Sequence, residues 1–183
     1  MLDSSFHADL APPQAAVLAR IRLASPADVP FIVDAIVAES KRGHFSCDCS
    51  QPDVVRGLWH QIQTVVSEGV TPLPGARDGA GGRAFVVQVG QVNAGFAILV
   101  EQAPGSWRQR LELFAMATDE RFRGQGIGQV LVRSLVKESQ SEVVYARCAL
   151  ASTGIQAVLR SCGFVEAAAS EPGSLTLEVR RPG

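Results

Sequence analysis

The chain has 183 residues, of which 46% are hydrophobic and 19% are charged, which is enough sequence for one domain with a sizeable core. Its formal net charge of -1 leaves no long-range field to collect nucleic acid or an anionic membrane surface, so partners of those two kinds are not expected. No apolar run approaches the roughly 20 residues that a membrane-spanning helix needs.

The N-terminal part of the chain is expected to form a tail, a strand and a helix. Residues 1–15 are polar and lack the basic start and apolar core of a secretion signal, so they are interpreted as a flexible tail. Alternating apolar side chains predict a strand over residues 16–23. Ser25 and Asp28 then supply a hydroxyl cap and an acid three residues later, a pattern that predicts the start of a helix running towards Gly43.

The middle of the chain is predicted to hold one helix and then several strands. Apolar side chains recur at a spacing of three and four over residues 52–67, which indicates a helix. Trp59 follows this spacing and is therefore expected in the core. Residues 69–82 are rich in glycine and proline and are interpreted as a loop. Three consecutive strands are predicted next: 84–89, 92–101 and 111–118.

The last third of the chain alternates between helical and strand patterns. A glycine-spaced turn at residues 124–128 leads into a helical pattern. After it we predict a strand at 143–148, a helix at 153–161 and a strand at 175–180. Consecutive strands followed by this alternation predict an α+β fold, in which a mainly antiparallel sheet carries helices on its faces within one domain at residues 16–183.

The glycine-spaced turn is the segment most suited to binding a ligand. Glycines allow the backbone to approach a ligand closely, and the free amides and dipole at a helix start favour a diphosphate. A P-loop would need a lysine followed by Ser or Thr after its last glycine, but Gln129 takes that place. The dinucleotide fingerprint needs Gly-x-Gly-x-x-Gly early in a long parallel sheet, which this chain lacks. The pattern Arg-x-x-Gly-x-Gly is met by Arg123, Gly126 and Gly128. A glycine-rich turn without a ligand is the alternative.

Three segments resemble the GCN5-related N-acetyltransferase (GNAT) family. The string Arg123-Gly124-Gln125-Gly126-Ile127-Gly128 closely resembles the acetyl-CoA pyrophosphate loop of that family. Residues 27–32 are similar to the start of its first helix, and residues 162–164 to the Gly-Phe pair that ends its last helix. The matches occur in the family's order and span about Arg20 to Phe164.

The resemblance implies the GNAT fold, with a mixed, mostly antiparallel sheet of about six or seven strands and about four flanking helices. It also implies an N-acetyltransferase, in which an acceptor amine directly attacks the acetyl group of acetyl-CoA. A small-molecule amine is the expected acceptor, and acetylation of a protein terminus or lysine stays open. A non-catalytic acyl-CoA-binding or regulatory module is the alternative. Dimers are common in the family, so a homodimer is a further expectation.

The resemblance carries cofactor contacts over to two stretches of this chain. In the family, backbone amides of the glycine loop hold the diphosphate, which here corresponds to Arg123, Gly124, Gln125, Gly126, Ile127, Gly128 and Gln129. The preceding strand splays from its neighbour and pairs with the pantetheine arm, which here corresponds to Phe114, Ala115, Met116, Ala117 and Thr118. An amide of that strand would polarise the thioester carbonyl. The side chain of Arg123 has an alternative role, which is to anchor the turn.

The groups that move protons are less directly implied. Glu112 is the expected base, because it lies six residues before Thr118, where histone-type members carry their glutamate. Pairing with a nearby arginine is its alternative, and many members use waters. In many members of the family a tyrosine protonates the leaving thiolate. Its position is held here by Leu159, which cannot donate a proton. Tyr145 lies on the preceding strand and is expected to serve in packing. Weaker donors remain: Ser152, Thr153, Ser161 and Cys162.

The loop between the first two helices borders the acceptor site in this family. The residues expected to line that site are Glu39, His44, Asp48 and Asp53, and the carboxylates among them would suit a cationic amine. An ordinary solvated loop is the alternative. A zinc site is conceivable at His44, Cys47, Cys49 and His60. It is not expected, because the spacing lacks paired Cys-x-x-Cys knuckles.

The cysteines point to a reducing environment and to no covalent role. Four cysteines in a chain of this size are too few and too scattered for a disulfide framework, so a cytoplasmic location is expected. Cys162 is a conceivable nucleophile, but no histidine follows it in the sequence, and buried packing is expected instead.

Overall fold

The computed structural model describes residues 18–45, 48–72, 80–103, 105–168 and 173–181. The expected tail at 1–15 and the first two residues of the first predicted strand lie outside this part of the chain. Seven strands form one sheet in the order β1-β2-β3-β4-β5-β7-β6, and every neighbouring pair is antiparallel except β4 and β5. Their bounds are β1 (Ala19–Leu23), β2 (Gly82–Val89), β3 (Val92–Glu101), β4 (Arg110–Thr118), β5 (Val143–Ala149), β6 (Val165–Glu166) and β7 (Ser174–Arg180).

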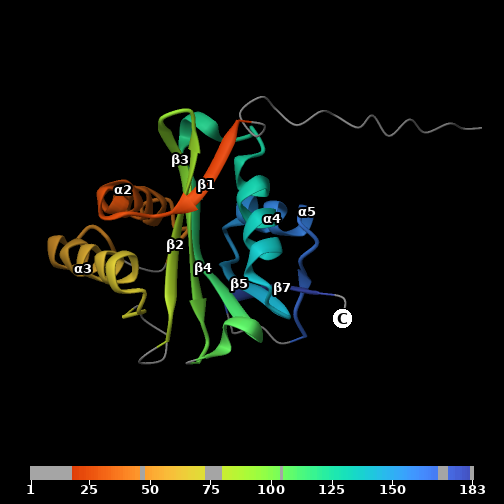
Figure 1. Ribbon diagram of the computed structural model, residues 1–183. Helices are drawn as coiled ribbons and strands as arrows, with labels where there is room; N and C mark the ends of the chain where they lie inside the picture. The colour runs from red at the N-terminus through yellow and green to blue at the C-terminus, as the bar shows by residue number, and fades with distance from the viewer. Residues whose placement is uncertain (1–17, 46–47, 73–79, 104, 169–172, 182–183) are drawn as a thin grey trace, which may run out of the picture.

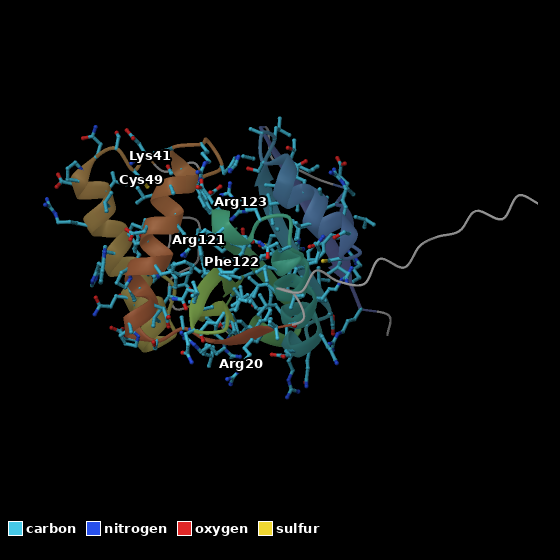
Figure 2. All side chains as sticks on the ribbon, turned by 90° about the horizontal axis from the view of Figure 1, so that it is seen from above. Arg20, Lys41, Cys49, Arg121, Phe122 and Arg123 are labelled. Atoms are coloured by element: carbon cyan, nitrogen blue, oxygen red, sulfur yellow. The ribbon has the colours of Figure 1, made fainter. Side chains whose placement is uncertain are left out.

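Helices cover both faces of the sheet. The pair α2 (Val29–Ser40) and α3 (Pro52–Glu68) lies on one face, and the pair α4 (Ile127–Ser139) and α5 (Thr153–Ser161) lies on the other (Figure 1). The same layers are seen from above in Figure 2. Three short 3-10 turns complete the order: η1 (Pro26–Asp28), η2 (Ser106–Arg108) and η3 (Glu120–Phe122). The described residues thus confirm the α+β class, the mostly antiparallel sheet and the four helices.

The core consists of two apolar clusters, one on each side of the sheet. Ile32, Ile62 and Phe96 belong to the cluster beneath α2 and α3. Leu131 and Leu159 belong to the cluster beneath α4 and α5. Each helix pair therefore buries its apolar stripe against its own face of the sheet, which is the layer arrangement expected of an α+β domain.

The strand β6 and the position of Trp59 differ from the sequence prediction. The short strand β6 was missed, because two residues are too few to show a period of two. The placement of Trp59 in the core was wrong, since this side chain is 39% exposed. The buried residues of α3 are Ile62 and Val65, and Trp59 stands at the edge of that apolar stripe.

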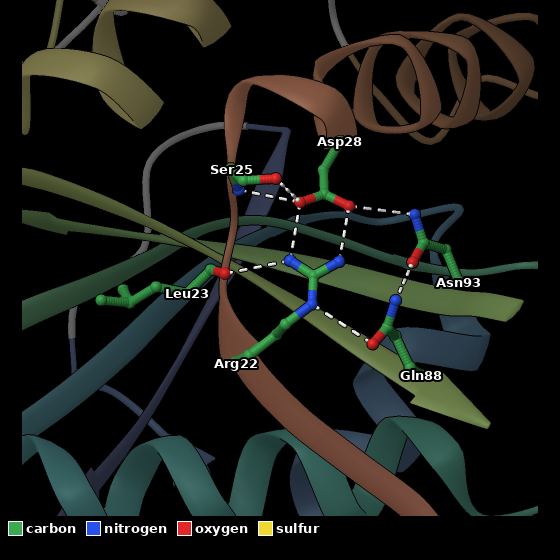
Figure 3. Close-up of polar contacts among 6 residues, drawn as sticks. All are labelled: Arg22, Leu23, Ser25, Asp28, Gln88 and Asn93. Atoms are coloured by element: carbon green, nitrogen blue, oxygen red, sulfur yellow. Dashed lines mark hydrogen bonds and ion pairs between the residues drawn. The ribbon is translucent and has the colours of Figure 1, made fainter. Parts of the chain in front are cut away.

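A closed ring of polar side chains ties the start of the first helical segment to the sheet (Figure 3). Asp28 is buried and accepts hydrogen bonds from Arg22 at 2.7 and 2.8 Å and from the Ser25 amide at 2.8 Å. Asn93 donates to the same carboxylate at 3.2 Å and accepts from Gln88, which in turn accepts from Arg22. The ring joins β1, β2, β3 and η1.

Neutralising Asp28 is expected to destabilise the fold in a pH-dependent way. The hydrogen bonds from Arg22 hold the pKa of Asp28 well below its usual range, although burial opposes this. The carboxylate therefore stabilises the fold above the unfolded pKa of about 3.9, and this contribution is lost as the pH falls below it. For Asp28→Asn we expect a loss of about 1 to 2 kcal/mol at neutral pH, measured by urea unfolding, which shrinks below about pH 4.

Asp53→Asn is the matched control for this prediction, because Asp53 pairs with Arg56 on the surface, where both side chains are largely exposed. Its effect is expected to stay within about 0.5 kcal/mol. An equal loss for Asp28→Asn at neutral and at acid pH would contradict the electrostatic explanation.

Candidate active site

The sheet is split between β4 and β5. These two strands pair in parallel only where Arg110–Glu112 faces Val143–Tyr145, although β4 continues to Thr118 and β5 to Ala149. On its other side, β4 stays paired with β3 as far as Thr118. The backbone edge of β4 beyond Glu112 therefore faces a gap, where it has no strand partner.

A β-bulge in β4 lies where the split begins. Ile98 of β3 faces Ala115, but the next residue, Leu99, faces Leu113. Phe114 is therefore an extra residue on β4. A bulge bends the strand that carries it and increases its local twist. The bend lies at the position where β5 ends its pairing with β4.

The turn after β4 leads into α4 through two glycines in the left-handed region. Gly124 has φ of +71° and Gly126 has φ of +77°, a conformation that favours glycine. Gly126 is the N-cap of the 13-residue helix α4. The first amides of α4 thus lack helical partners and lie at the positive end of the helix dipole. This turn can hold an anion such as a diphosphate.

The split and the turn open into one cleft of about 540 Å³. The residues predicted to bind the cofactor line this cleft, with one exception. They are Phe114, Ala115, Met116, Ala117, Thr118, Arg123, Gly124, Gly126, Ile127, Gly128 and Gln129. The exception is Gln125, whose side chain donates a hydrogen bond to the carbonyl of Arg121 at 2.8 Å.

The opposite wall of the cleft was not assigned from the sequence. It consists of the end of β5 and the first part of α5, and its residues are Ala146, Arg147, Cys148, Ala149, Ser152, Gly154, Ile155 and Val158. The sequence predicted this strand and this helix, but only the splaying that the family resemblance implied could have indicated that they form a wall. Burial raises the pKa of the Cys148 thiol to about 11, so this group is protonated at neutral pH.

The C-terminal end of α2 contributes the third side of the cleft. Glu39 and His44, two of the four candidates for the acceptor side, line the cleft together with Phe45. The other two candidates do not line it: Asp48 accepts hydrogen bonds from Ser50, and Asp53 forms its surface ion pair. The described structure therefore brings only part of the predicted set together.

Glu39 is the centre of a charged network at this end of the cleft. It is 8% exposed, and one carboxylate oxygen lies 2.6 Å from Nδ1 of His44. The other oxygen accepts hydrogen bonds from the guanidinium groups of Arg42 and Arg123. Burial favours the neutral acid, but the hydrogen bond from His44 and the positive charges of Arg123 and Arg42 outweigh it and lower the pKa of Glu39. Glu39 is therefore an ionised carboxylate at neutral pH.

Arg123 connects the glycine turn to α2. Besides its bond to Glu39, its Nε donates to the carbonyl of Thr118 at 3.3 Å. A second ion pair, Arg42 to Glu120, runs between the same two segments. Figure 2 shows Arg123 lying between α2 on one side and α4 and α5 on the other. The side chain thus anchors the turn, which is the alternative role that the sequence left open.

Glu112 is buried in a second network, next to the point where β4 and β5 part. It is 3% exposed and accepts from Arg147 at 2.8 and 3.2 Å, from Gln102 at 2.8 Å and from Tyr145 at 3.2 Å. Among the described residues it does not line the cleft. These contacts favour the ion-pair interpretation, with a buried rather than an exposed carboxylate. Its role as the base stays a prediction.

The candidate proton donors differ in their surroundings. Ser152 lines the cleft, and its buried Oγ has no hydrogen-bond partner among the described residues. Ser161 instead donates to the carbonyl of Val158 at 2.7 Å. The Cys162 sulfur donates to a backbone carbonyl and lies outside the cleft lining. Leu159 is fully buried in the core.

The described residues contain no cluster of three or more His, Cys, Asp or Glu side chains that could hold a metal ion. Cys47, one of the candidates for zinc, lies outside those residues. Within the same part of the chain, no helix is both long and apolar enough to cross a membrane.

Comparison with a family model identifies the family of this chain, and comparison with solved structures identifies its fold. The model of the acetyltransferase (GNAT) family matches residues 54–164, and a search of curated proteins found no match. A spermidine N-acetyltransferase from Vibrio cholerae, solved with CoA and spermine, has a TM-score of 0.66 at 15% identity, covering 90% of this chain and 96% of that chain.

Two further structures show the same likeness. An acetyltransferase from Thermus thermophilus has a TM-score of 0.66 at 17% identity, covering 92% of this chain and 100% of that chain. An alpha-N-protein acetyltransferase of a ribosomal protein, solved with coenzyme A, has a TM-score of 0.60 at 14% identity, covering 93% and 98% of the two chains. At these identities the likeness concerns the fold.

Proposed function

The chain belongs to the acetyltransferase (GNAT) family, whose co-substrate is acetyl-CoA, and we propose that it transfers the acetyl group to the amine of a small molecule in the cleft between β4 and β5. The observation that carries this proposal is the split of the sheet, which leaves an open strand edge leading directly to a glycine turn and a helix N-terminus.

The cofactor is proposed to lie along these features. The free amides of the turn and of the first residues of α4 suit the diphosphate, from Gly124 to Gln129. The amide of Arg123 instead donates to the carbonyl of Glu120 at 3.3 Å. The open edge of β4, from Phe114 to Thr118, offers backbone groups to the amides of the pantetheine arm. A donor on that edge would stabilise the oxyanion that forms when the thioester carbonyl is attacked.

Direct transfer is the mechanism that these residues favour. The amine nitrogen attacks the carbonyl carbon, a C–N bond forms, and the electron pair of the C–S bond leaves with the sulfur. A thiol of pKa about 8.5 departs readily as the thiolate. Ser152 is the candidate donor that lines the cleft, and its Oγ has no hydrogen-bond partner among the described residues, whereas Thr153 and Ser161 do not line the cleft. Cys148 is an unactivated thiol, which argues against an acyl-cysteine intermediate.

The charges of the cleft favour an acceptor with one amine rather than a polycation. Glu39 is the one carboxylate among the described lining residues, and its negative charge is balanced by the ion pairs with Arg42 and Arg123. Phenylalanines contribute apolar surface: Phe45, Phe114 and Phe122. A small monoamine with an apolar body suits this surface better than spermidine does.

Turnover with amines separates the enzyme from a non-catalytic acyl-CoA-binding module. The protein is incubated with acetyl-CoA and with phenethylamine, spermidine or a peptide with a free N-terminus, and the release of the CoA thiol is followed. We expect release that depends on an amine and is fastest with phenethylamine. Binding of acetyl-CoA without turnover of any amine would favour the regulatory module, and failure to bind would overturn both functions.

A further inference from the structure

The pair of His44 and Glu39 is a feature of the cleft that the proposed function has not yet used. Both side chains line the cleft, and Nδ1 of His44 lies 2.6 Å from a carboxylate oxygen of Glu39. We propose that His44 accepts the proton of the attacking amine and that Glu39 positions its ring. This role rests on the proposed acetyl transfer.

The hydrogen bond to Glu39 determines which nitrogen of His44 can act as a base. An ionised carboxylate only accepts hydrogen bonds, so Nδ1 of the neutral ring carries the proton and donates it to Glu39. The other nitrogen, Nε2, then has a free lone pair. A carboxylate that fixes the tautomer and orientation of a histidine, and stabilises the imidazolium, is the arrangement used by Ser-His-Asp hydrolases.

The positive charges around His44 keep Glu39 ionised, so that it can accept the hydrogen bond from Nδ1. Arg42 follows the end of α2 and Arg123 comes from the glycine turn, and both guanidinium groups bond Glu39. Glu120, on η3, neutralises Arg42 in turn. The side chain of His44 is itself 38% exposed.

The step balances without any further reagent. The amine enters as its neutral form, having lost its extra proton to water, and its nitrogen forms the C–N bond. Nε2 of His44 takes one proton from that nitrogen as the C–S bond breaks, which leaves an amide, a thiolate and an imidazolium. The imidazolium then returns the proton to the thiolate, giving the CoA thiol and a neutral His44.

Glu112 is less suited to this role. Its two carboxylate oxygens already accept hydrogen bonds from Arg147, Gln102 and Tyr145, and it lies outside the cleft lining. His44 lies in the cleft, and no described residue forms a hydrogen bond with its Nε2, the nitrogen that carries no proton in the tautomer set by Glu39.

The test compares pH profiles of kcat/KM for phenethylamine, at saturating acetyl-CoA, in the wild type and in His44→Gln. A general base contributes about 100-fold or more, so His44→Gln is expected to lose about that factor, with an unchanged Kd for acetyl-CoA. It is also expected to lose the acid fall, meaning the fall in rate at acid pH that remains after correction for protonation of the amine itself. His60→Gln is the matched control, because His60 is exposed on α3 and lies outside the cleft, and its profile should equal that of the wild type.

The possible results separate this role from the proposed function. If His44→Gln transfers acetyl groups with the rate and pH profile of the wild type, the role of His44 is overturned and the transferase stands. If the fall of kcat/KM at acid pH, corrected for protonation of the amine, disappears in Glu112→Gln and persists in His44→Gln, Glu112 is the base. If the wild type binds acetyl-CoA but acetylates no amine, the proposed function fails and the role of His44 with it.

A measurement on the wild type avoids dependence on the folding of the variant. Nitrogen NMR of the histidine rings distinguishes the two tautomers. Comparison with His7→Gln and His60→Gln identifies the signals of the other two histidines, which leaves those of His44. We expect the Nδ1–H tautomer for His44. The Nε2–H tautomer would overturn the proposal, because the nitrogen that should accept the proton would already carry one.

Discussion

Replacing Gly126 with tryptophan is expected to weaken acetyl-CoA binding by more than about 100-fold. Gly126 stands immediately before the first free amides of α4, with φ of +77°. An indole there would occupy the space in front of those amides. Charge-assisted hydrogen bonds are worth about 1.5 to 3 kcal/mol each, so the loss of two to a diphosphate accounts for a factor of this size.

Calorimetric titration with acetyl-CoA measures this effect, and Gly90→Trp is its matched control. Gly90 also has a positive φ, of +62°, and nothing lies within 4 Å of the position of an added Cβ. Both variants carry a similar backbone strain of about 1 to 2 kcal/mol, but Gly90 lies in the β2–β3 hairpin, away from the cleft. Wild-type affinity in a folded Gly126→Trp variant would show that the diphosphate binds elsewhere.

A single added methyl group at Gly95 is expected to disturb both the fold and the cleft. Gly95 lies on β3 opposite Thr118, and a Cβ there would stand 2.7 Å from the carbonyl oxygen of Ala117 and 3.1 Å from Val87. The closest atom belongs to the backbone of β4, so the strand itself has to move. We expect Gly95→Ala to lower the free energy of unfolding by about 3 kcal/mol, at the upper end of the cost of overpacking.

The same variant is expected to bind acetyl-CoA more weakly, because the displaced segment at Ala117 and Thr118 lines the cleft. Gly57→Ala provides the comparison. Gly57 lies inside α3 with open space around it, and alanine there should stabilise the helix by about 0.5 to 1 kcal/mol. Urea unfolding of both variants gives the two changes, and a neutral Gly95→Ala would mean that β3 and β4 are less closely packed than described.

The features that could be predicted from the sequence are those that depend on residues close together along the chain. The elements at 92–101 and 153–161 were predicted with the bounds that the structure has, since turn or capping residues flank both segments. The glycine turn was recognisable because its function needs glycines at fixed spacing. Trp59 was misplaced for a related reason: helical spacing identifies an apolar stripe, but only the packed neighbours determine its edge.

The rest of the candidate site depends on contacts between distant parts of the chain. Glu39 and Arg123 are 84 residues apart, and no local pattern indicates that they meet. Glu112 was singled out by its position relative to Thr118, whereas its surroundings are set by Arg147, which lies 35 residues later. The hydrogen-bonding capacity of a carboxylate is used up by its partners in space, and these are visible only in the folded chain.

The split between β4 and β5 has a consequence for the integrity of the sheet. The two strands are paired over a short stretch at one end. Strand pairing between the two parts of the sheet, β1 to β4 and β5 to β7, is therefore limited to that stretch. On the proposed function, the pantetheine arm takes the place of the missing pairing along β4. The co-substrate then also completes the sheet, and each release of product leaves the strand pairing between β4 and β5 limited to that short stretch, while the apolar cluster beneath α4 and α5 still joins the two parts.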